Sequence, residues 1–425
     1  MTFKKNTLEN GLRIITVPMK NTETVTVLVL VGAGSKYETK EINGISHFLE
    51  HLFFKGTKKR PNTLKISEVL DKVGGNYNAF TDKEFTGYFA KVPSKYFDLA
   101  LDWISDIFLN SKFESREIEK EKGVLIEEMN MYYDTPIKYV GDLFEKLLYQ
   151  EQPAGWLIIG EKENIKKIKR EEIINYYKNH YSALNTVICV SGKLGEDNIE
   201  KKIRNYFRNI RPTPPLGKLK VIEKQNQPQV LTHLKETEQT HLCLGVRAYD
   251  LNHPLRYALE ILSIILGGNM SSRLFISLRA KKGLCYYIQT TSHFFIDSGY
   301  LVTQAGVPNE KVNEVIKSII EEYKSIKNKK ISDLEIKKAK DYYKGALTLS
   351  LEGSDDYASF YSFQELLSGK ILTPKEKFAK IDKVAKRDIL ELTSDIFQPE
   401  KLNLALIGPH KEKKVFENLL YGTNF

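Results

Sequence analysis

Residues 44–57 read Gly-Ile-Ser-His-Phe-Leu-Glu-His-Leu-Phe-Phe-Lys-Gly-Thr. The run is too apolar for a solvated helix face, so it predicts a largely buried helix that ends near Gly56. His47 and His51 are four residues apart and point the same way on a helix. Buried polar groups need partners, and two imidazoles on one face can hold one zinc ion. The 8 histidines of the chain include no other pair with this spacing.

Glu50 stands next to His51 and projects near the same helix face without having to be a ligand. A free carboxylate beside a metal-bound water is suited to general-base hydrolysis. The order His-x-x-Glu-His is the inverted form of the His-Glu-x-x-His zinc signature. The alternative is a pair of ordinary polar histidines on an amphipathic helix.

Composition bounds the class of protein. The 425 residues, 41% of them hydrophobic, are enough for two or more domains with a sizeable core. The chain has no long apolar run for a membrane span and begins without the apolar stretch of a signal peptide. Three widely spaced cysteines are typical of small core residues in a reducing compartment, so a cytoplasmic location is expected. The net charge of +10 raises nucleic-acid binding as an alternative, but the lysines are mixed with acids along helical stretches, which favours a solvated surface.

The chain reads as two related halves. Residues 24–31 and 240–246 are rich in β-branched and apolar residues and predict strands, and each is followed by an apolar helix, residues 45–56 and 257–266. Aligning the two helices puts Tyr257 and Ile261 at the positions of the histidines, so the second half would lack metal ligands. Further helices are expected over residues 66–73 and 96–109. An α+β fold is predicted, with two homologous sandwich domains, each an antiparallel-rich sheet packed with helices.

Proline and glycine in residues 211–218 can continue neither a helix nor a central strand and indicate a boundary. The expected division is a metal-binding domain over residues 1–212, a linker over 213–226 and a second domain over 227–425.

Residues 117–129 predict an acidic helix that can supply a third ligand. Glu121, Leu125 and Glu128 fall on one stripe, whereas Glu119 and Glu127 fall off it and are expected to be solvated. Carboxylates on a half-buried stripe are costly unless a positive group pairs with them, and a zinc ion would do so. The alternative is an acidic surface helix.

Together, residues 47–57 and this acidic helix resemble the insulinase/pitrilysin family of zinc metallopeptidases, particularly its smaller, processing-peptidase-like members, over nearly the whole chain. The resemblance implies one zinc ion per chain, bound by His47, His51 and Glu128, which lies 77 residues after His51. Glu127 fits the family's spacing nearly as well, and the stripe favours Glu128. The resemblance also implies that Glu121 orients a histidine ligand from outside the coordination sphere and that Glu50 is the general base.

Two further segments match family motifs. Residues 74–81 resemble an edge strand that pairs with the substrate backbone, where Asn78 and Ala79 match; an ordinary hairpin is the alternative and is compatible with it. Arg279 and Tyr286, seven residues apart, match a pair that binds the substrate carbonyl and stabilises the tetrahedral intermediate. The alternative there is a surface arginine and a half-buried tyrosine. No Gly-Lys-Ser/Thr follows Gly267-Gly268, so a nucleotide site is rejected.

Family members enclose peptides in a chamber of four such domains, and this chain supplies two, half of a clamshell. The resemblance thus implies an endopeptidase for peptides or unfolded segments, active as a homodimer or a heterodimer with a related chain. Arg279 and Tyr286 are expected to act on the partner's zinc site. No membrane or nucleic-acid partner is expected, and manganese or cobalt would also suit the ligands. The alternative function is a non-catalytic subunit of a processing-peptidase-like complex.

Overall fold

The computed structural model describes residues 2–195, 198–328 and 330–423. Their contacts divide the chain into two compact units, each assembled from separate stretches of sequence. Unit 1 comprises Met1–Asn130, Trp156–Leu219 and Thr348–Thr373. Unit 2 comprises Met131–Gly155, Lys220–Leu347 and Pro374–Phe425.

Unit 1 is built on a six-stranded mixed sheet. The strands, in spatial order, are β1 (Lys4–Thr7), β2 (Arg13–Pro18), β6 (Thr186–Gly192), β3 (Thr24–Val31), β5 (Thr86–Pro93) and β4 (Asn76–Thr81). Strands β2 and β6 are parallel and the other neighbours are antiparallel. The β-branched run of β3 is buried on both faces because helices cover both sides of the sheet.

Unit 2 repeats this pattern with five strands. Their spatial order is β7 (Gln229–Leu234), β11 (Leu402–Gly408), β8 (Gln239–Arg247), β10 (Gly299–Pro308) and β9 (Tyr287–Phe294). The order 7-11-8-10-9 corresponds position by position to 2-6-3-5-4 in unit 1, and the parallel pair again joins the first two strands. The predicted α+β fold of two homologous sheet-and-helix domains is therefore confirmed, with one parallel pairing in each sheet.

The helices occupy the intervals between these strands. In unit 1 or at its border they are α1 (Ile45–Leu52), α2 (Thr63–Asp71), α3 (Phe97–Asn110), α4 (Ser115–Tyr133), α6 (Lys162–Lys167), α7 (Arg170–His180), α8 (Ile199–Tyr206) and α12 (Ser354–Ser368). In unit 2 they are α5 (Pro136–Tyr149), α9 (Arg256–Gly267), α10 (Val312–Lys327), α11 (Asp333–Leu349, which begins in this unit), α13 (Pro374–Lys383), α14 (Lys386–Ile396) and α15 (Lys413–Tyr421). The strands and helices expected around residues 24–31, 66–73, 96–109, 117–129, 240–246 and 257–266 are all present.

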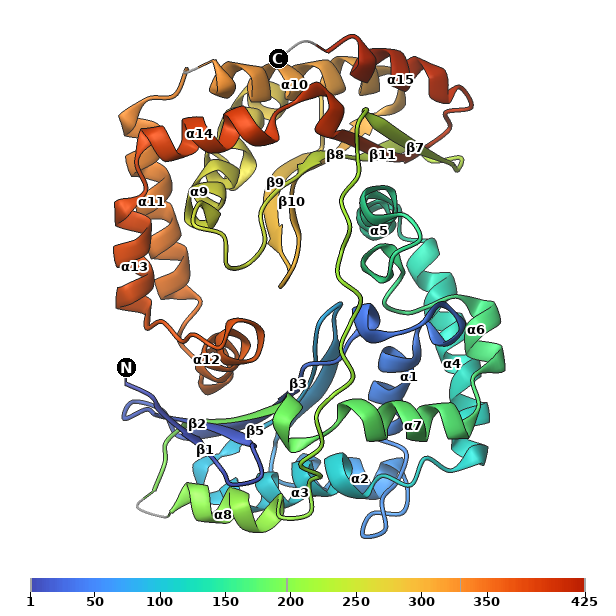
Figure 1. Cartoon of the computed structure of the whole chain (residues 1–425), viewed down its shortest axis with the longest axis vertical. Helices are drawn as coiled ribbons and strands as arrows, with labels where there is room; N and C mark the ends of the chain where they lie inside the picture. Colours follow the sequence, from blue (N-terminus) through green and yellow to red (C-terminus); the bar gives the residue numbers. More distant parts are fainter. Residues whose placement is uncertain (1, 196–197, 329, 424–425) are drawn as a thin grey trace. The chain divides into compact units, whose positions relative to one another are not determined.

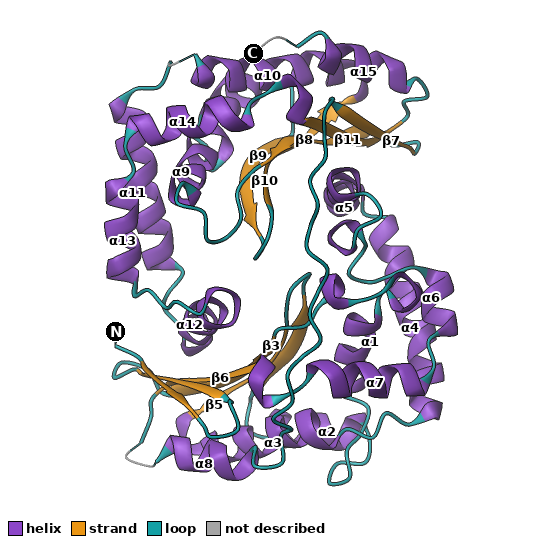
Figure 2. Ribbon diagram, viewed as in Figure 1, coloured by secondary structure: helices purple, strands orange, loops and turns teal. Residues whose placement is uncertain are grey.

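Each sheet is covered on one face by a helix from the other half of the sequence. In unit 1, α12 packs on β3 and β6, and Leu28, Leu30 and Tyr361 share its apolar cluster. Figure 2 shows the strands of this sheet between α12 on one face and α3 and α8 on the other. In unit 2, α5 packs on β8 and β11 (Figure 1), through an apolar cluster that includes Phe144 and Ile407. The two units therefore differ from the predicted continuous domains, residues 1–212 and 227–425, in that α5 belongs to unit 2 and α12 to unit 1.

Two composition-based expectations concern the core and the membrane. Cys189, Cys243 and Cys285 are free and buried, as small core residues. In the described ranges we find no helix with the length and apolar character needed to cross a membrane.

Candidate metal centre

Helix α1 presents the two histidines, and its start is fixed by a buried carboxylate. Gly44 precedes the helix with a φ of +99°, and an added Cβ there would lie 2.7 Å from the carbonyl oxygen of Ile159. The Glu38 carboxylate accepts hydrogen bonds from the backbone N–H groups of Gly44 (2.8 Å) and Ser46 (2.9 Å). A carboxylate on the first amides of a helix satisfies donors that have no partner within the helix. The position of α1 is therefore set at its first turn.

Helix α4 carries the acidic stripe, which is buried at Glu121 and Leu125 and partly exposed at Glu128. Glu121 is 4% exposed and Leu125 is fully buried, whereas the Glu128 side chain is 43% exposed. Glu127 is exposed, as expected from its position off the stripe. Val124, next to Leu125 but off the stripe, is 50% exposed.

His47, His51 and Glu128 lie together although the carboxylate comes from a different helix. Glu128 Oε1 is 3.7 Å from His47 Nε2, and Glu128 Oε2 is 3.4 Å from His51 Nε2. One ligand atom from each residue lies within 4.8 Å of the others, and no second group of histidine, cysteine or acidic residues meets this criterion in the described chain. Tetrahedral zinc with bonds of about 2.0–2.1 Å places its ligand atoms roughly 3.3 Å apart. The distances and the two-nitrogen, one-oxygen donor set fit a zinc ion.

The outer environment favours metal-binding forms of the histidines. Glu121 Oε1 lies 2.9 Å from His51 Nδ1. Burial opposes ionisation of Glu121, but the hydrogen bonds from His51 and Lys55 outweigh it and lower its pKa. Because a carboxylate only accepts hydrogen bonds, His51 Nδ1 is the donor in this contact, and Nε2 is the ring nitrogen that faces Glu128. Burial and the neighbouring His51 lower the pKa of His47 to about 3, so the His47 imidazole is neutral near pH 7.

Glu50 is held apart from the three candidate ligands. Its Oε2 accepts a hydrogen bond of 2.5 Å from Thr81 Oγ1 on β4. Burial raises the pKa of Glu50 above its ordinary value, and the nearby Glu128 carboxylate adds to the effect, although the Thr81 hydrogen bond and His51 oppose it. A half-buried carboxyl group beside the histidines, with a pKa above its ordinary value, is suited to proton transfer.

The predicted substrate-binding residues are distributed over both units. Asn78 and Ala79 lie on β4, an edge strand of its sheet that also contacts α1; Asn78 is exposed, and its Oδ1 accepts from Ala79 N–H at 2.9 Å. Arg279 lies in unit 2 on a π-helical segment, Phe275–Lys281, with its guanidinium 4.9 Å from the centre of the Phe275 ring. Tyr286 is 60% exposed, more than the half-buried alternative implied. The roles of these four residues stay predictions.

Three contributors to the site were not identified from the sequence: Glu38, Lys55 and Thr81. Lys55 stands four residues after His51, so the helix spacing carried a signal for it. Thr81 stands two residues after Ala79 on β4, so the two side chains lie on the same face of the strand. Glu38 lies in a loop before the helix, and nothing in its local pattern distinguishes it from a solvated acid.

Comparisons with known proteins identify the family of the chain. Residues 13–162 match the model of the insulinase family, peptidase family M16, and residues 167–343 match that of the M16 inactive domain. A protein of Bacillus subtilis named uncharacterized zinc protease YmxG is 37% identical over 96% of this chain and 98% of its own. An uncharacterized zinc protease of Streptomyces coelicolor is 30% identical over 97% of this chain and 91% of its own.

Two solved structures share the fold. A protease from Helicobacter pylori has a TM-score of 0.90 at 23% identity and covers 96% of this chain and 99% of its own. A Pseudomonas fluorescens structure described as a peptidase M16 inactive domain has a TM-score of 0.88 at 16% identity and covers 97% of this chain and 100% of its own. The family models and the full-length relatives lead to one conclusion: the chain belongs to the insulinase family of peptidases, family M16.

Proposed function

We propose that the chain is a zinc-dependent endopeptidase that hydrolyses peptides or unfolded protein segments. The observation that carries this proposal is the convergence of His47, His51 and Glu128, with Glu50 beside them and outside the candidate ligand set. The curated relatives named zinc proteases support the same class of activity.

Each residue has a task in this proposal. His47 Nε2, His51 Nε2 and one Glu128 oxygen hold zinc, which when bound supplies a Lewis acid that polarises a peptide carbonyl and acidifies water. Glu50 takes a proton from the attacking water and passes it to the leaving amine. Thr81 orients the Glu50 carboxylate through Oε2, which leaves Oε1 for the proton.

Substrate recognition is proposed to use an edge strand and a donor pair. An extended peptide would pair with β4 beside Asn78 and Ala79, which brings its backbone to the strand that carries Thr81. Arg279 and Tyr286 would donate hydrogen bonds to the developing oxyanion. We further propose a dimer in which this pair serves the zinc site of the partner subunit, and which encloses the substrate in a chamber. The free, buried cysteines support a reducing, cytoplasmic location.

Metal analysis combined with a fluorogenic peptide assay tests the proposal. We expect one zinc per chain and cleavage that a chelator abolishes and added zinc restores. One zinc per chain without chelator-sensitive cleavage of any peptide in a mixed library would instead support the non-catalytic subunit. Mass spectrometry of the library after digestion by the wild type and by Glu50→Gln would then define the cleavage preference.

A further inference from the structure

Each oxygen of the Glu121 carboxylate contacts a different side chain, one in the last turn of α1 and one just after it. Its Oε1 accepts from His51 Nδ1 at 2.9 Å, and its Oε2 lies 2.7 Å from Lys55 Nζ. The Glu121 side chain is 5% exposed and that of Lys55 is 23% exposed, so the pair is largely removed from water. Charge-assisted contacts of this length in a buried setting restrict the carboxylate to one orientation.

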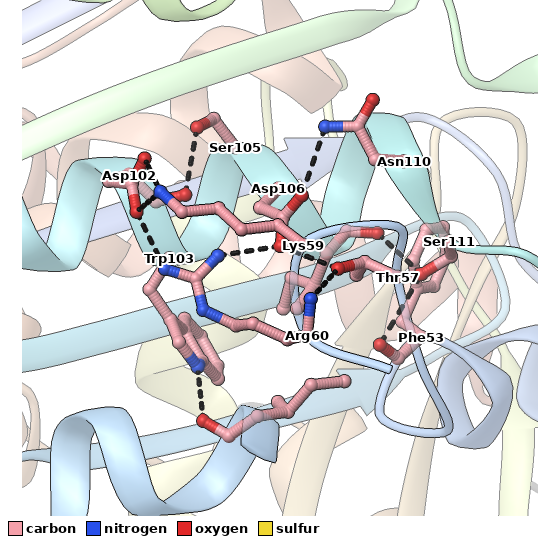
Figure 3. Close-up of polar contacts among 12 residues, drawn as sticks. Phe53, Thr57, Lys59, Arg60, Asp102, Trp103, Ser105, Asp106, Asn110 and Ser111 are labelled. Atoms are coloured by element: carbon pink, nitrogen blue, oxygen red, sulfur yellow. Dashed lines mark hydrogen bonds and ion pairs between the residues drawn. The ribbon is translucent and has the colours of Figure 1, made fainter. Parts of the chain in front are cut away.

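Hydrogen bonds on either side of Lys55 in the chain hold its backbone in place. Its N–H donates to the Leu52 carbonyl at 3.1 Å, which continues the last turn of α1. Beyond it, Thr57 Oγ1 donates to Asp106 Oδ2 at 2.7 Å, and Arg60 Nη1 bonds the same oxygen at 2.6 Å. Figure 3 shows how these contacts fasten the loop after Phe53 to α3. The Lys55 ammonium therefore reaches Glu121 from a fixed backbone.

From this geometry we infer that Lys55 is a positioning residue of the metal centre. By occupying Glu121 Oε2 it keeps Oε1 on the His51 Nδ1–H group, and the His51 imidazole is thereby fixed with Nε2 toward Glu128. The inference rests on the proposed zinc site but concerns a residue outside the ligand set and outside the predicted catalytic residues. Without Lys55, Glu121 Oε2 would lose its cationic partner in a buried position, and the carboxylate would leave its orientation on His51.

The charge of Lys55 also affects zinc affinity directly, in the direction opposite to the positioning effect. A lysine charge near a divalent cation repels it, and removal of the charge would by itself strengthen zinc binding. Glu121 lies between the ammonium and His51, however, and its negative charge offsets this repulsion. Changes to groups that orient metal-bound histidines typically cost about 10–100-fold in metal affinity. The positioning effect is therefore expected to be the larger of the two.

The test is the zinc dissociation constant of Lys55→Met, measured by competition with a fluorescent chelator. We expect an affinity about 10-fold weaker than that of the wild type. The matched control is Lys59→Met, which removes the same charge from the same loop but breaks only an exposed contact with Asp102, and which should change the affinity less than about 2-fold. An unchanged or tighter affinity in Lys55→Met overturns the inference.

The route through Glu121 is tested by a double-mutant cycle. In a Glu121→Ala background, whose folding is checked by thermal unfolding, Lys55→Met should cause no further loss of zinc affinity. A loss as large as in the wild-type background contradicts positioning through Glu121.

A measurement on the metal-free protein separates this inference from the proposed function. Nitrogen-15 spectra of the His51 ring should show the Nδ1–H tautomer in the wild type and a mixture of tautomers in Lys55→Met. An identical tautomer in both proteins overturns the inference, whether or not zinc binds. A wild type that binds no zinc would defeat the proposed function, while the ring spectra would still decide the role of Lys55.

Discussion

At the level of single residues, three glutamate carboxylates near the candidate metal centre contact different partners, and a different role is proposed for each. Glu128 faces the Nε2 atoms of both histidines, Glu121 accepts from the far side of His51, and Glu50 is bonded to Thr81. In the proposed mechanism the same functional group would serve as zinc ligand, orienting acceptor and proton carrier. Two variants separate these roles.

Glu50→Gln should abolish catalysis and leave the metal in place. The amide keeps the size of the side chain but cannot accept a proton, so we expect turnover to fall by about 10³-fold at unchanged zinc content. Peptide cleavage rates and metal analysis of the same preparation provide the measurement. Full activity in this variant would remove Glu50 from the mechanism.

Glu128→Gln should weaken zinc binding directly. A neutral amide is a poor replacement for a carboxylate ligand, so the loss of affinity should exceed the roughly 10–100-fold typical of residues outside the coordination sphere. Glu127→Gln is the matched control, because Glu127 is exposed and is the adjacent residue on the same helix. If the control lost zinc and Glu128→Gln retained it, the ligand assignment would have to move to Glu127.

At the scale of elements, the loop between α1 and α2 is fixed by an ion-pair cluster on α3. Arg60 is 5% exposed, and its two terminal nitrogens each lie 2.6 Å from a carboxylate oxygen, one of Asp102 and one of Asp106 (Figure 3). The Trp103 indole of the same helix donates to the Ile66 carbonyl of α2 at 2.8 Å. These contacts join the loop that follows α1, and helix α2, to α3 within unit 1.

Arg60→Met should therefore destabilise the protein substantially. It leaves the buried Asp106 carboxylate without its cation, and breaking a buried pair costs about 3–5 kcal/mol. Lys59→Met breaks a pair in which the lysine side chain is 58% exposed, and should cost about 1 kcal/mol or less. The free energy of unfolding from denaturant titration measures both, and equal losses would contradict the assigned difference.

The elements that local sequence determines were predictable. The β-branched composition of residues 24–31 predicted a strand, and the apolar run with its four-residue histidine spacing around His47 predicted a helix. The Arg60 cluster and the Lys55–Glu121 contact were not predictable, because each joins segments more than 40 residues apart in the chain. Likewise, the stripe on α4 indicated Glu121 and Glu128 but not the greater exposure of Glu128, which depends on where the packing around α4 ends.

At the scale of the whole molecule, the fold is a duplication with exchanged helices. The two strand-then-helix segments of the sequence indicated the repeat, because each segment is a local pattern. The exchange of α5 and α12 was not, because the apolar face of an amphipathic helix does not indicate which of two similar sheets it will cover. The predicted alignment of the two apolar helices places Tyr257 and Ile261 at the positions of the histidines, and residues 167–343 match the model of an inactive domain.

The proposed dimer predicts that two differently inactivated subunits can complement each other. If Arg279 and Tyr286 act on the partner's zinc site, mixing a Glu50→Gln subunit with an Arg279→Ala subunit should restore part of the activity, because one site of the mixed dimer has both components intact. Peptide cleavage measured after subunit exchange provides the readout. Two inactive variants whose mixture stays inactive, despite proven exchange, would count against action in trans.

The proposed function depends on one zinc ion bound by His47, His51 and Glu128. Crystallography of the zinc-loaded protein, with anomalous data collected on both sides of the zinc absorption edge, tests it most directly. We expect a single strong anomalous peak per chain, about 2.0–2.2 Å from Nε2 of both histidines and from a Glu128 oxygen. A peak elsewhere, or none in a fully zinc-loaded crystal, would contradict it.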